Sequence, residues 1–194
     1  MDDLRQWSEP RKWNPDLRIN GLSSTLRDYW QWGYWDILVN TNRPVFAEFV
    51  VASLLGATNR LRREWEEFDI LYKEKKIEIK SSAYLQSWPQ KEYSKIIFDI
   101  AQRKRWDYEK GEWGNKIKRW ADCYVFCLYT EKESKDLDFV LDLSRWNFYL
   151  AMTDDIDKHF GGQKKAGYNA LNSLWEGPIM IDNLKEKVDQ LLKI

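Results

Sequence analysis

The chain has 194 residues with 31 Lys and Arg, 31 Asp and Glu and one His, so its formal net charge at neutral pH is zero. This length suits one domain with a hydrophobic core, and 43% hydrophobic with 32% charged residues is typical of a globular protein. One His and two Cys exclude most zinc sites and catalytic schemes built on several histidines. No segment approaches the roughly 20 apolar residues of a membrane span. The N-terminus lacks the layout of a signal peptide, which favours a cytoplasmic location.

The N-terminal part is expected to form a helical extension over residues 1–42. Thr25 and the two serines before it precede apolar residues at helical spacing, and hydroxyl side chains are suited to cap a helix N-terminus. A second helix is predicted over residues 44–55. Pro44 suits a first helical turn, and Gly56 suits the position just after a helix.

The core of the single domain is expected over residues 43–175. A short helix is predicted from Asp154, and Asp182 can cap a C-terminal helix within residues 176–194. Helices before and after a run of strands indicate an α/β fold with a central mixed β-sheet flanked by helices. Strands are predicted at residues 68–72, 76–80, 95–100, 122–129 and, more weakly, 138–143.

Four charged residues in this core form an unusual group. Glu48 is the only charge on the apolar helix 44–55, and a buried carboxylate is costly unless it is paired, protonated or bound to a cation. An ion pair with an arginine is the structural alternative. On the next hairpin, strand alternation puts Glu78 and Lys80 on one face, and the turn brings Asp69 next to both. We therefore expect the three carboxylates to converge on one cation-sized space beside the lysine ammonium.

Three carboxylates and one lysine suit the metal-assisted hydrolysis of a phosphodiester bond. Carboxylate oxygens are ligands that Mg²⁺ prefers, and the metal acidifies a bound water and neutralises charge on the phosphate. A nearby ammonium orients that water or helps to deprotonate it, and stabilises the developing negative charge. The expected cofactor is Mg²⁺, with Mn²⁺ expected to substitute for it.

The order of these residues resembles the PD-(D/E)XK nuclease superfamily, which has the restriction-endonuclease-like fold. Glu48 lies on a helix, and Asp69 lies nine positions before Glu78, which is followed by Ile and then Lys80. Most of residues 22–175 is similar to uncharacterised bacterial members of this superfamily. The resemblance implies a restriction-endonuclease-like core that follows the N-terminal helical extension.

The resemblance also implies the roles of individual residues. Gln86 resembles a glutamine that some relatives carry after the lysine strand, where it contacts the attacking water or a phosphate. A polar residue that merely ends the strand is an equal alternative. Phe68 stands where the superfamily motif has proline, a position that varies among its members. The implied metal ligands are Glu48, Asp69 and Glu78, and the implied catalytic residues are these three with Lys80 and Gln86.

Basic residues outside this group are candidates for contacts with the DNA backbone. Residues 91–120 hold nine Lys or Arg and five acids, a net charge of +4, whereas residues 121–157 hold three bases and nine acids, a net charge of −6. Four tryptophans lie among or next to the bases of the first window, a pattern that suits single-stranded nucleic acid. A solvated charged face and core tryptophans are the ordinary alternatives. Candidate DNA-binding residues are Arg60, Arg62, Arg63, Arg103, Lys104, Arg105, Lys164 and Lys165.

The sequence thus predicts a metal-dependent deoxyribonuclease, an endonuclease of the restriction or repair type whose partner is DNA. Cutting both strands would favour a homodimer. The alternative is a non-catalytic DNA-binding or interaction module on the same fold, against which the intact group of acids argues. A glycosidase with two carboxylates would use the tryptophans for sugar stacking but leaves Lys80 without a role.

Overall fold

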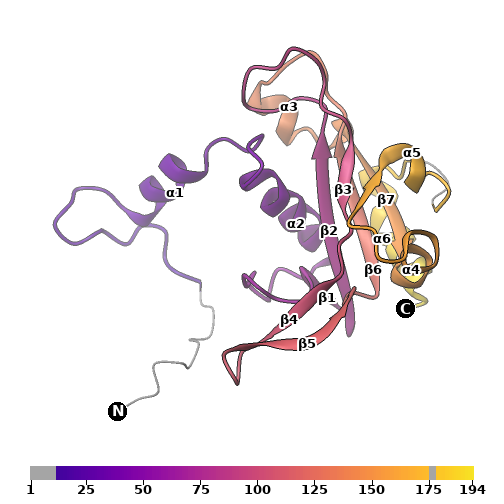
Figure 1. Ribbon diagram of the computed structural model, residues 1–194. Helices are drawn as coiled ribbons and strands as arrows, with labels where there is room; N and C mark the ends of the chain where they lie inside the picture. The colour runs from indigo at the N-terminus through magenta and orange to yellow at the C-terminus, as the bar shows by residue number, and fades with distance from the viewer. Residues whose placement is uncertain (1–11, 175–177) are drawn as a thin grey trace.

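The computed structural model describes residues 12–174 and 178–194 and is built around a four-stranded sheet of order β1-β2-β6-β7 (Figure 1). β2 and β6 run parallel, and the two outer pairs are antiparallel, so the predicted mixed sheet is confirmed. Every residue of β6 is buried, because this strand is central and covered on both faces. The strands are β1 (Ile70–Tyr72), β2 (Lys75–Ala83), β6 (Cys123–Tyr129) and β7 (Trp146–Met152).

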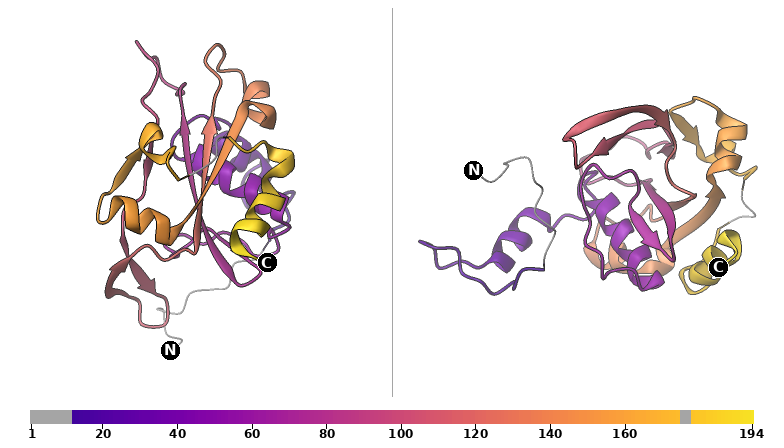
Figure 2. Two further views of the ribbon diagram at one scale, coloured as in Figure 1. Left: turned by 90° about the vertical axis from the view of Figure 1, so that its right-hand side faces the viewer. Right: turned by 90° about the horizontal axis from the view of Figure 1, so that it is seen from below.

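Helices flank the sheet, as the sequence predicts (Figure 2). On one face α2 and α6 pack against Ile77 and Ile79 of β2 and against alternate residues of β6 and β7. On the other face α4, α5 and the small β3–β8 sheet enclose a second cluster around Phe126 and Tyr149. The elements are α2 (Asn42–Leu55), β3 (Ile97–Asp99), α4 (Thr153–Phe160), β8 (Lys165–Gly167), α5 (Tyr168–Leu171) and α6 (Ile181–Leu192).

The helix α2 confirms the prediction for residues 44–55 and begins two residues earlier. It ends where Gly56 adopts a left-handed conformation, with φ of 71°, which glycine tolerates without a Cβ clash. The Ala57 N–H then donates to the carbonyl of Ala52 at 2.8 Å and closes the helix end. This closure turns the chain back along the sheet toward β1.

The β1–β2 hairpin has a two-residue turn at Lys73 and Glu74, whose φ angles are 47° and 64°. Turns with two positive φ angles match the twist of antiparallel strands. The pairing runs from Tyr72 opposite Lys75 to Ile70 opposite Ile77 and stops there. β2 continues to Ala83, so β1 leaves the outer edge of β2 uncovered beyond Ile77.

A second hairpin, β4 (Arg103–Asp107) with β5 (Glu112–Lys118), forms a separate two-stranded sheet that extends from the body of the protein (Figure 1). Sequence analysis did not predict these strands. Their residues are polar and half-buried or exposed, so the alternation that marks a strand packed on a core is absent.

The strand predicted at 138–143 is wrong, because most of this segment is helical. The Asp136 carboxylate accepts a hydrogen bond from the Asp138 N–H at 3.2 Å and caps the helix that follows. The fourth strand of the sheet is instead the aromatic segment β7, which runs antiparallel to β6. The two helices in this region are α3 (Leu137–Leu141) and the 3₁₀ helix η1 (Leu143–Arg145).

The N-terminal helix α1 (Leu26–Tyr34) stands away from the sheet and buries no residue (Figure 1). Thr25 caps it as predicted: its hydroxyl accepts from the Asp28 N–H at 3.3 Å, while its own N–H donates to the Asp28 carboxylate at 2.6 Å. At the other end of the chain, Met180 and not Asp182 is the N-cap of α6. Residues 1–11 of the expected extension and the expected boundary at residue 175 lie outside the described residues.

No helix in the described part of the chain is long and apolar enough to cross a membrane.

Candidate active site

Asp69 lies immediately before the first residue of β1, next to the part of the β2 edge that β1 does not cover. Its N–H donates to the Ile77 carbonyl at 3.0 Å, and its carboxylate accepts from the Ile79 N–H at 2.7 Å. The side chain therefore satisfies a backbone donor that β1 is too short to reach. This contact fixes the Asp69 carboxylate directly beside the β2 segment that carries Glu78 and Lys80.

Glu78 and Lys80 project from the same face of β2, as strand alternation predicts. The Lys80 ammonium donates to the Glu78 carboxylate at 2.5 Å. The two side chains are 23% and 19% exposed, so this ion pair is largely shielded from water.

Glu48 comes from α2 and is 9% exposed. Its carboxylate accepts a hydrogen bond at 2.6 Å from Nε of Arg62, whose own side chain is 42% exposed. The sequence left open whether Glu48 pairs with an arginine, and it does. Arg62, predicted as a DNA contact, thereby belongs to the same site as the carboxylates.

The acid cluster, defined here as Glu48, Asp69 and Glu78, gathers around the open edge of β2. The helix α2 covers the face of Ile77 and Ile79, whereas Glu78 projects from the opposite face of β2, so the acid cluster draws on both faces of the sheet. The carboxylates nevertheless act on each other electrostatically, because no strand separates them at this edge.

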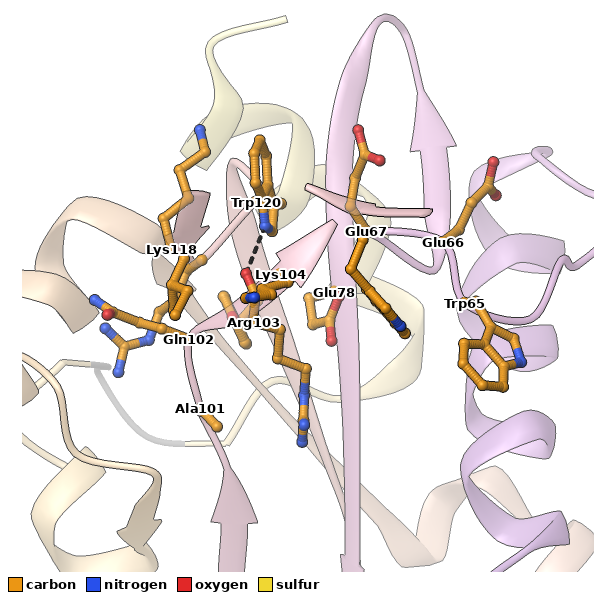
Figure 3. A pocket seen from close by; sticks show the side chains of 14 residues that line it. Trp65, Glu66, Glu67, Glu78, Ala101, Gln102, Arg103, Lys104, Lys118 and Trp120 are labelled. Carbon is orange, nitrogen blue, oxygen red and sulfur yellow. Dashed lines mark hydrogen bonds between the residues drawn. The ribbon is translucent and has the colours of Figure 1, made fainter. Parts of the chain in front are cut away.

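Two cavities reach the acid cluster from the two faces of the sheet. One, of about 370 Å³, has Glu48, Asp69 and Arg62 on its wall. The other, of about 530 Å³, has Glu78 on its wall (Figure 3). The two cavities share no lining residue, so the carboxylates of the acid cluster are divided between them.

Burial raises the pKa of every carboxyl in the acid cluster, and the charge of Asp69 adds to this effect at Glu48 and Glu78. Burial, and then the charge of Asp69, raise the pKa of Glu78 from 4.5 to about 7, against the opposing effect of Lys80. Burial raises the pKa of Asp69 although Lys80 and the Ile79 N–H favour its ionised form. Burial and Asp69 raise the pKa of Glu48 against the effect of Arg62. Arg62 and Lys80 therefore offset the cost of ionising these carboxyls only in part.

Lys80 remains a cation in this setting. Burial lowers the pKa of its ammonium, but the charges of Glu78 and Asp69 raise it by more, and the net shift is upward. A lysine with a raised pKa keeps its proton at neutral pH. Lys80 is therefore suited to stabilise negative charge and not to abstract a proton from water.

The expected single cation-sized space is not formed by the side chains as they stand. Within residues 12–174 and 178–194, no three His, Cys, Asp or Glu side chains are arranged to hold a metal ion. Arg62 and Lys80 instead hold Glu48 and Glu78. The chemistry of the donor set still fits a divalent cation, because carboxylate oxygens suit Mg²⁺ and the raised pKa values show that added positive charge is favoured.

Gln86 does not join this group. It is 5% exposed, its amide oxygen accepts from Nη1 of Arg43 at 3.1 Å, and its amide nitrogen donates to the Ala83 carbonyl at 3.0 Å. Arg43 lies in the first turn of α2 and also donates to the Leu38 carbonyl at 2.9 Å. Gln86 thus connects the end of β2 to the start of α2. These contacts agree with the alternative of a polar residue that ends the strand and has no catalytic role.

The predicted DNA-binding residues are dispersed over the surface. Arg60 pairs with Glu66, and the Arg63 guanidinium lies 5.8 Å from the centre of the Tyr108 ring. Lys164 and Lys165 are exposed, and Lys165 is the first residue of β8. Arg103, Lys104 and Arg105 are exposed on β4, and Arg103 and Arg105 pair with Asp99 at 2.5 Å and with Glu67 at 3.4 Å.

Of the three tryptophans that line the larger cavity beside Glu78, Trp113 and Trp120 belong to the basic window that the sequence indicated, whereas Trp65 was not predicted. Trp65 precedes β1 in a loop, Trp113 lies on β5, and Trp120 follows that strand. The interleaving of bases with Trp113 and Trp120 was a usable signal for this surface. Trp65 is far from that window in sequence, and no local pattern linked it to the hairpin.

The chain matches no protein-family model, no curated protein and no solved structure.

Proposed function

We propose that this protein is a metal-dependent nuclease that hydrolyses phosphodiester bonds of DNA, with Mg²⁺ as cofactor and Mn²⁺ as a substitute. The observation that carries the proposal is the acid cluster at the open edge of β2, whose carboxyl pKa values are all raised beside a cationic Lys80. The proposal includes a restriction-endonuclease-like core, which the mixed sheet flanked by helices supports.

The roles follow from the contacts of each side chain. Glu48, Asp69 and Glu78 would hold the metal, which when bound acidifies a water molecule and neutralises charge on the phosphate. Asp69 is held in place by the Ile79 N–H, so its orientation does not depend on the metal. Lys80 carries a fixed positive charge that can stabilise the developing oxyanion.

A second candidate function is a DNA-binding module that does not cleave. The observation that favours it is that Glu48 and Glu78 already have cationic partners in Arg62 and Lys80. Such pairs would be sufficient to keep buried carboxylates in a purely structural role. The two functions differ in whether the acid cluster is needed for chemistry.

Cleavage assays on Glu78→Gln and Lys80→Ala test the proposal. Each variant should reduce metal-dependent cleavage by about a hundredfold or more, because each removes a charge from the reacting centre. Lys76→Ala is the matched control, since Lys76 lies on the same strand and pairs with Glu67 at 2.7 Å outside the acid cluster. Full activity in both site variants would contradict the proposal.

Binding without metal separates the two functions. Glu78→Gln relieves repulsion between the acid cluster and phosphate and should bind DNA at least as well as the wild type. Lys80→Ala removes a positive charge and should bind slightly less well. If the wild type cuts no nucleic acid with any divalent metal, and both variants bind DNA as it does, the non-catalytic function replaces the proposed one.

A further inference from the structure

The larger cavity beside the acid cluster is lined by tryptophans together with basic and acidic side chains. Its volume of about 530 Å³ falls within the range of small-molecule sites. Glu78 lies between Trp120 on one side and Trp65 on the other in the view of Figure 3, with Arg103 and Lys104 nearby. A ligand in this cavity, here called the tryptophan cavity, would therefore touch indole rings, cations and Glu78 of the acid cluster. Two further acids line it, Glu66 and Glu67, and both already have cationic partners.

The indole rings of the tryptophan cavity are packed on one another and open to solvent. The ring centres of Trp65 and Trp113 lie 5.5 Å apart, and Trp106 lies 5.2 Å from Trp113 behind them. Trp65 is 58% exposed and Trp113 is 45% exposed. The Trp65 loop is held against the hairpin because the Tyr108 hydroxyl donates to the Glu64 carbonyl at 2.5 Å. The cavity thus presents a fixed aromatic surface to solvent.

Positive charge is concentrated at the same hairpin. Arg103 on β4 lies directly opposite Lys118 on β5, and like charges at directly opposed positions destabilise a strand pair. Within the described residues Lys104 has no ion-pair partner, and the Lys118 ammonium lies 4.5 Å from the centre of the Trp120 ring. The Asp99 carboxylate, which pairs with Arg103 at 2.5 Å, offsets part of this repulsion; an anionic ligand would offset more of it, whereas a neutral sugar would not.

We propose that the tryptophan cavity binds an unpaired nucleotide of the DNA substrate, with the base stacked on indole and the backbone phosphate beside Arg103 and Lys104. The proposal rests on the proposed nuclease function and specifies its substrate as DNA with a single-stranded segment next to the cleaved bond. Aromatic side chains stack on bases only where the bases are not already stacked in a duplex, and cations track the backbone. Glu78 on the cavity wall places this nucleotide next to the acid cluster.

Binding in EDTA, where metal-dependent cleavage is blocked, tests the proposal. Fluorescence anisotropy compares a labelled single-stranded oligonucleotide with a blunt duplex of the same sequence. Trp113→Ala should weaken single-strand binding by about tenfold or more and leave duplex binding unchanged. Trp88→Ala is the matched control, because Trp88 is also 45% exposed but does not line the cavity. Lys104→Ala should weaken single-strand binding more than the control Lys164→Ala, because Lys164 is an exposed lysine that does not line the cavity.

A fluorescent base in the oligonucleotide reports stacking directly. Wild-type protein should quench pyrrolocytosine in the single strand, Trp113→Ala should quench it less, and Trp113→Phe should restore binding because it keeps an aromatic face. Equal affinities for single strand and duplex, or equal losses in Trp113→Ala and Trp88→Ala, would overturn the proposal. Displacement of the oligonucleotide by neutral cellohexaose would assign the cavity to a sugar and would also overturn it.

The outcome is distinguishable from that of the proposed function, because the binding experiment needs neither metal nor cleavage. One outcome is a protein that cuts no DNA with any metal and still binds single strands in a way that depends on Trp113. That result would support the assignment of the tryptophan cavity and overturn the proposed nuclease function. Metal-dependent cleavage without a single-strand preference would support the nuclease and overturn the assignment of the cavity.

Discussion

Replacing Glu78 with glutamine tests whether the acid cluster is electrostatically strained in the folded protein. Glutamine has nearly the same shape and can still accept a hydrogen bond from Lys80. The substitution removes the titratable carboxyl of Glu78. Burial and the charge of Asp69 raise the pKa of this carboxyl from 4.5 to about 7. Since the ionised carboxylate is disfavoured in the folded protein, we expect Glu78→Gln to increase stability at neutral and alkaline pH.

The magnitude follows from the difference between the folded and unfolded pKa of Glu78. Stability from a raised carboxyl pKa is fully present below about pH 4.5 and is lost as the pH rises through about 7. A shift of this size corresponds to roughly 3 kcal/mol. The side chain is 19% exposed, and water screens part of the effect. We therefore expect a gain of about 2 kcal/mol at pH near 8 and almost none at pH near 4.5.

Urea unfolding followed by tryptophan fluorescence across this pH range measures the effect. Glu131→Gln is the control with the opposite sign. The N–H groups of Glu133 and Lys132 donate to the Glu131 carboxylate at 2.6 Å and 2.8 Å and lower its pKa. That variant should be less stable than the wild type by a nearly constant amount above about pH 4.5, and the difference should shrink below it, so the titrations extend below that pH. A Glu78→Gln variant that is less stable than the wild type near pH 8, or whose stability difference does not change with pH, would refute the electrostatic account of the acid cluster.

The remaining predictions concern contacts around the site. Arg62→Ala should lower the free energy of unfolding by about 1 kcal/mol at neutral pH, because Glu48 loses its partner. In urea titrations this loss should shrink on acidification, and a loss that does not change with pH would contradict the prediction. Gln86→Ala should lower the free energy of unfolding by about 1–2 kcal/mol without changing the cleavage rate of folded protein, and a lower rate at unchanged stability would restore a catalytic role. Replacing Arg103, Lys104 and Arg105 with alanine should lower the log–log salt slope of DNA binding by about 0.9 for each lost phosphate contact, and an unchanged slope would mean a solvated face.

The elements that could be predicted from sequence are those with a strong local pattern. The helix α2 has apolar residues on nearly all sides and a glycine at its end, and β6 is a continuous apolar run, so both were recognisable. The β4–β5 hairpin lies outside the two core clusters and contacts the Trp65 loop, so its strands have no such pattern. The segment 138–143 reads as a strand by its apolar residues, but the Asp136 cap decides in favour of a helix.

In the candidate site, too, the contacts between residues close in sequence could be predicted, whereas the contacts between distant residues could not. A two-residue turn determines the register of β1 and β2, so the approach of Asp69 to Glu78 follows from neighbouring residues. The pairing of Arg62 with Glu48 depends on how the loop after α2 folds back. The bond between Arg43 and Gln86 joins residues far apart in the chain, and no local pattern encodes it.

Incubation of the wild-type protein with plasmid, linear duplex and single-stranded DNA, in Mg²⁺, Mn²⁺ or EDTA, tests the central claim most directly. The account predicts cleavage of at least one of these substrates with either metal, no cleavage in EDTA, and loss of cleavage in Glu78→Gln. DNA that stays intact in both metals, or cleavage that continues unchanged in EDTA or in Glu78→Gln, would contradict it.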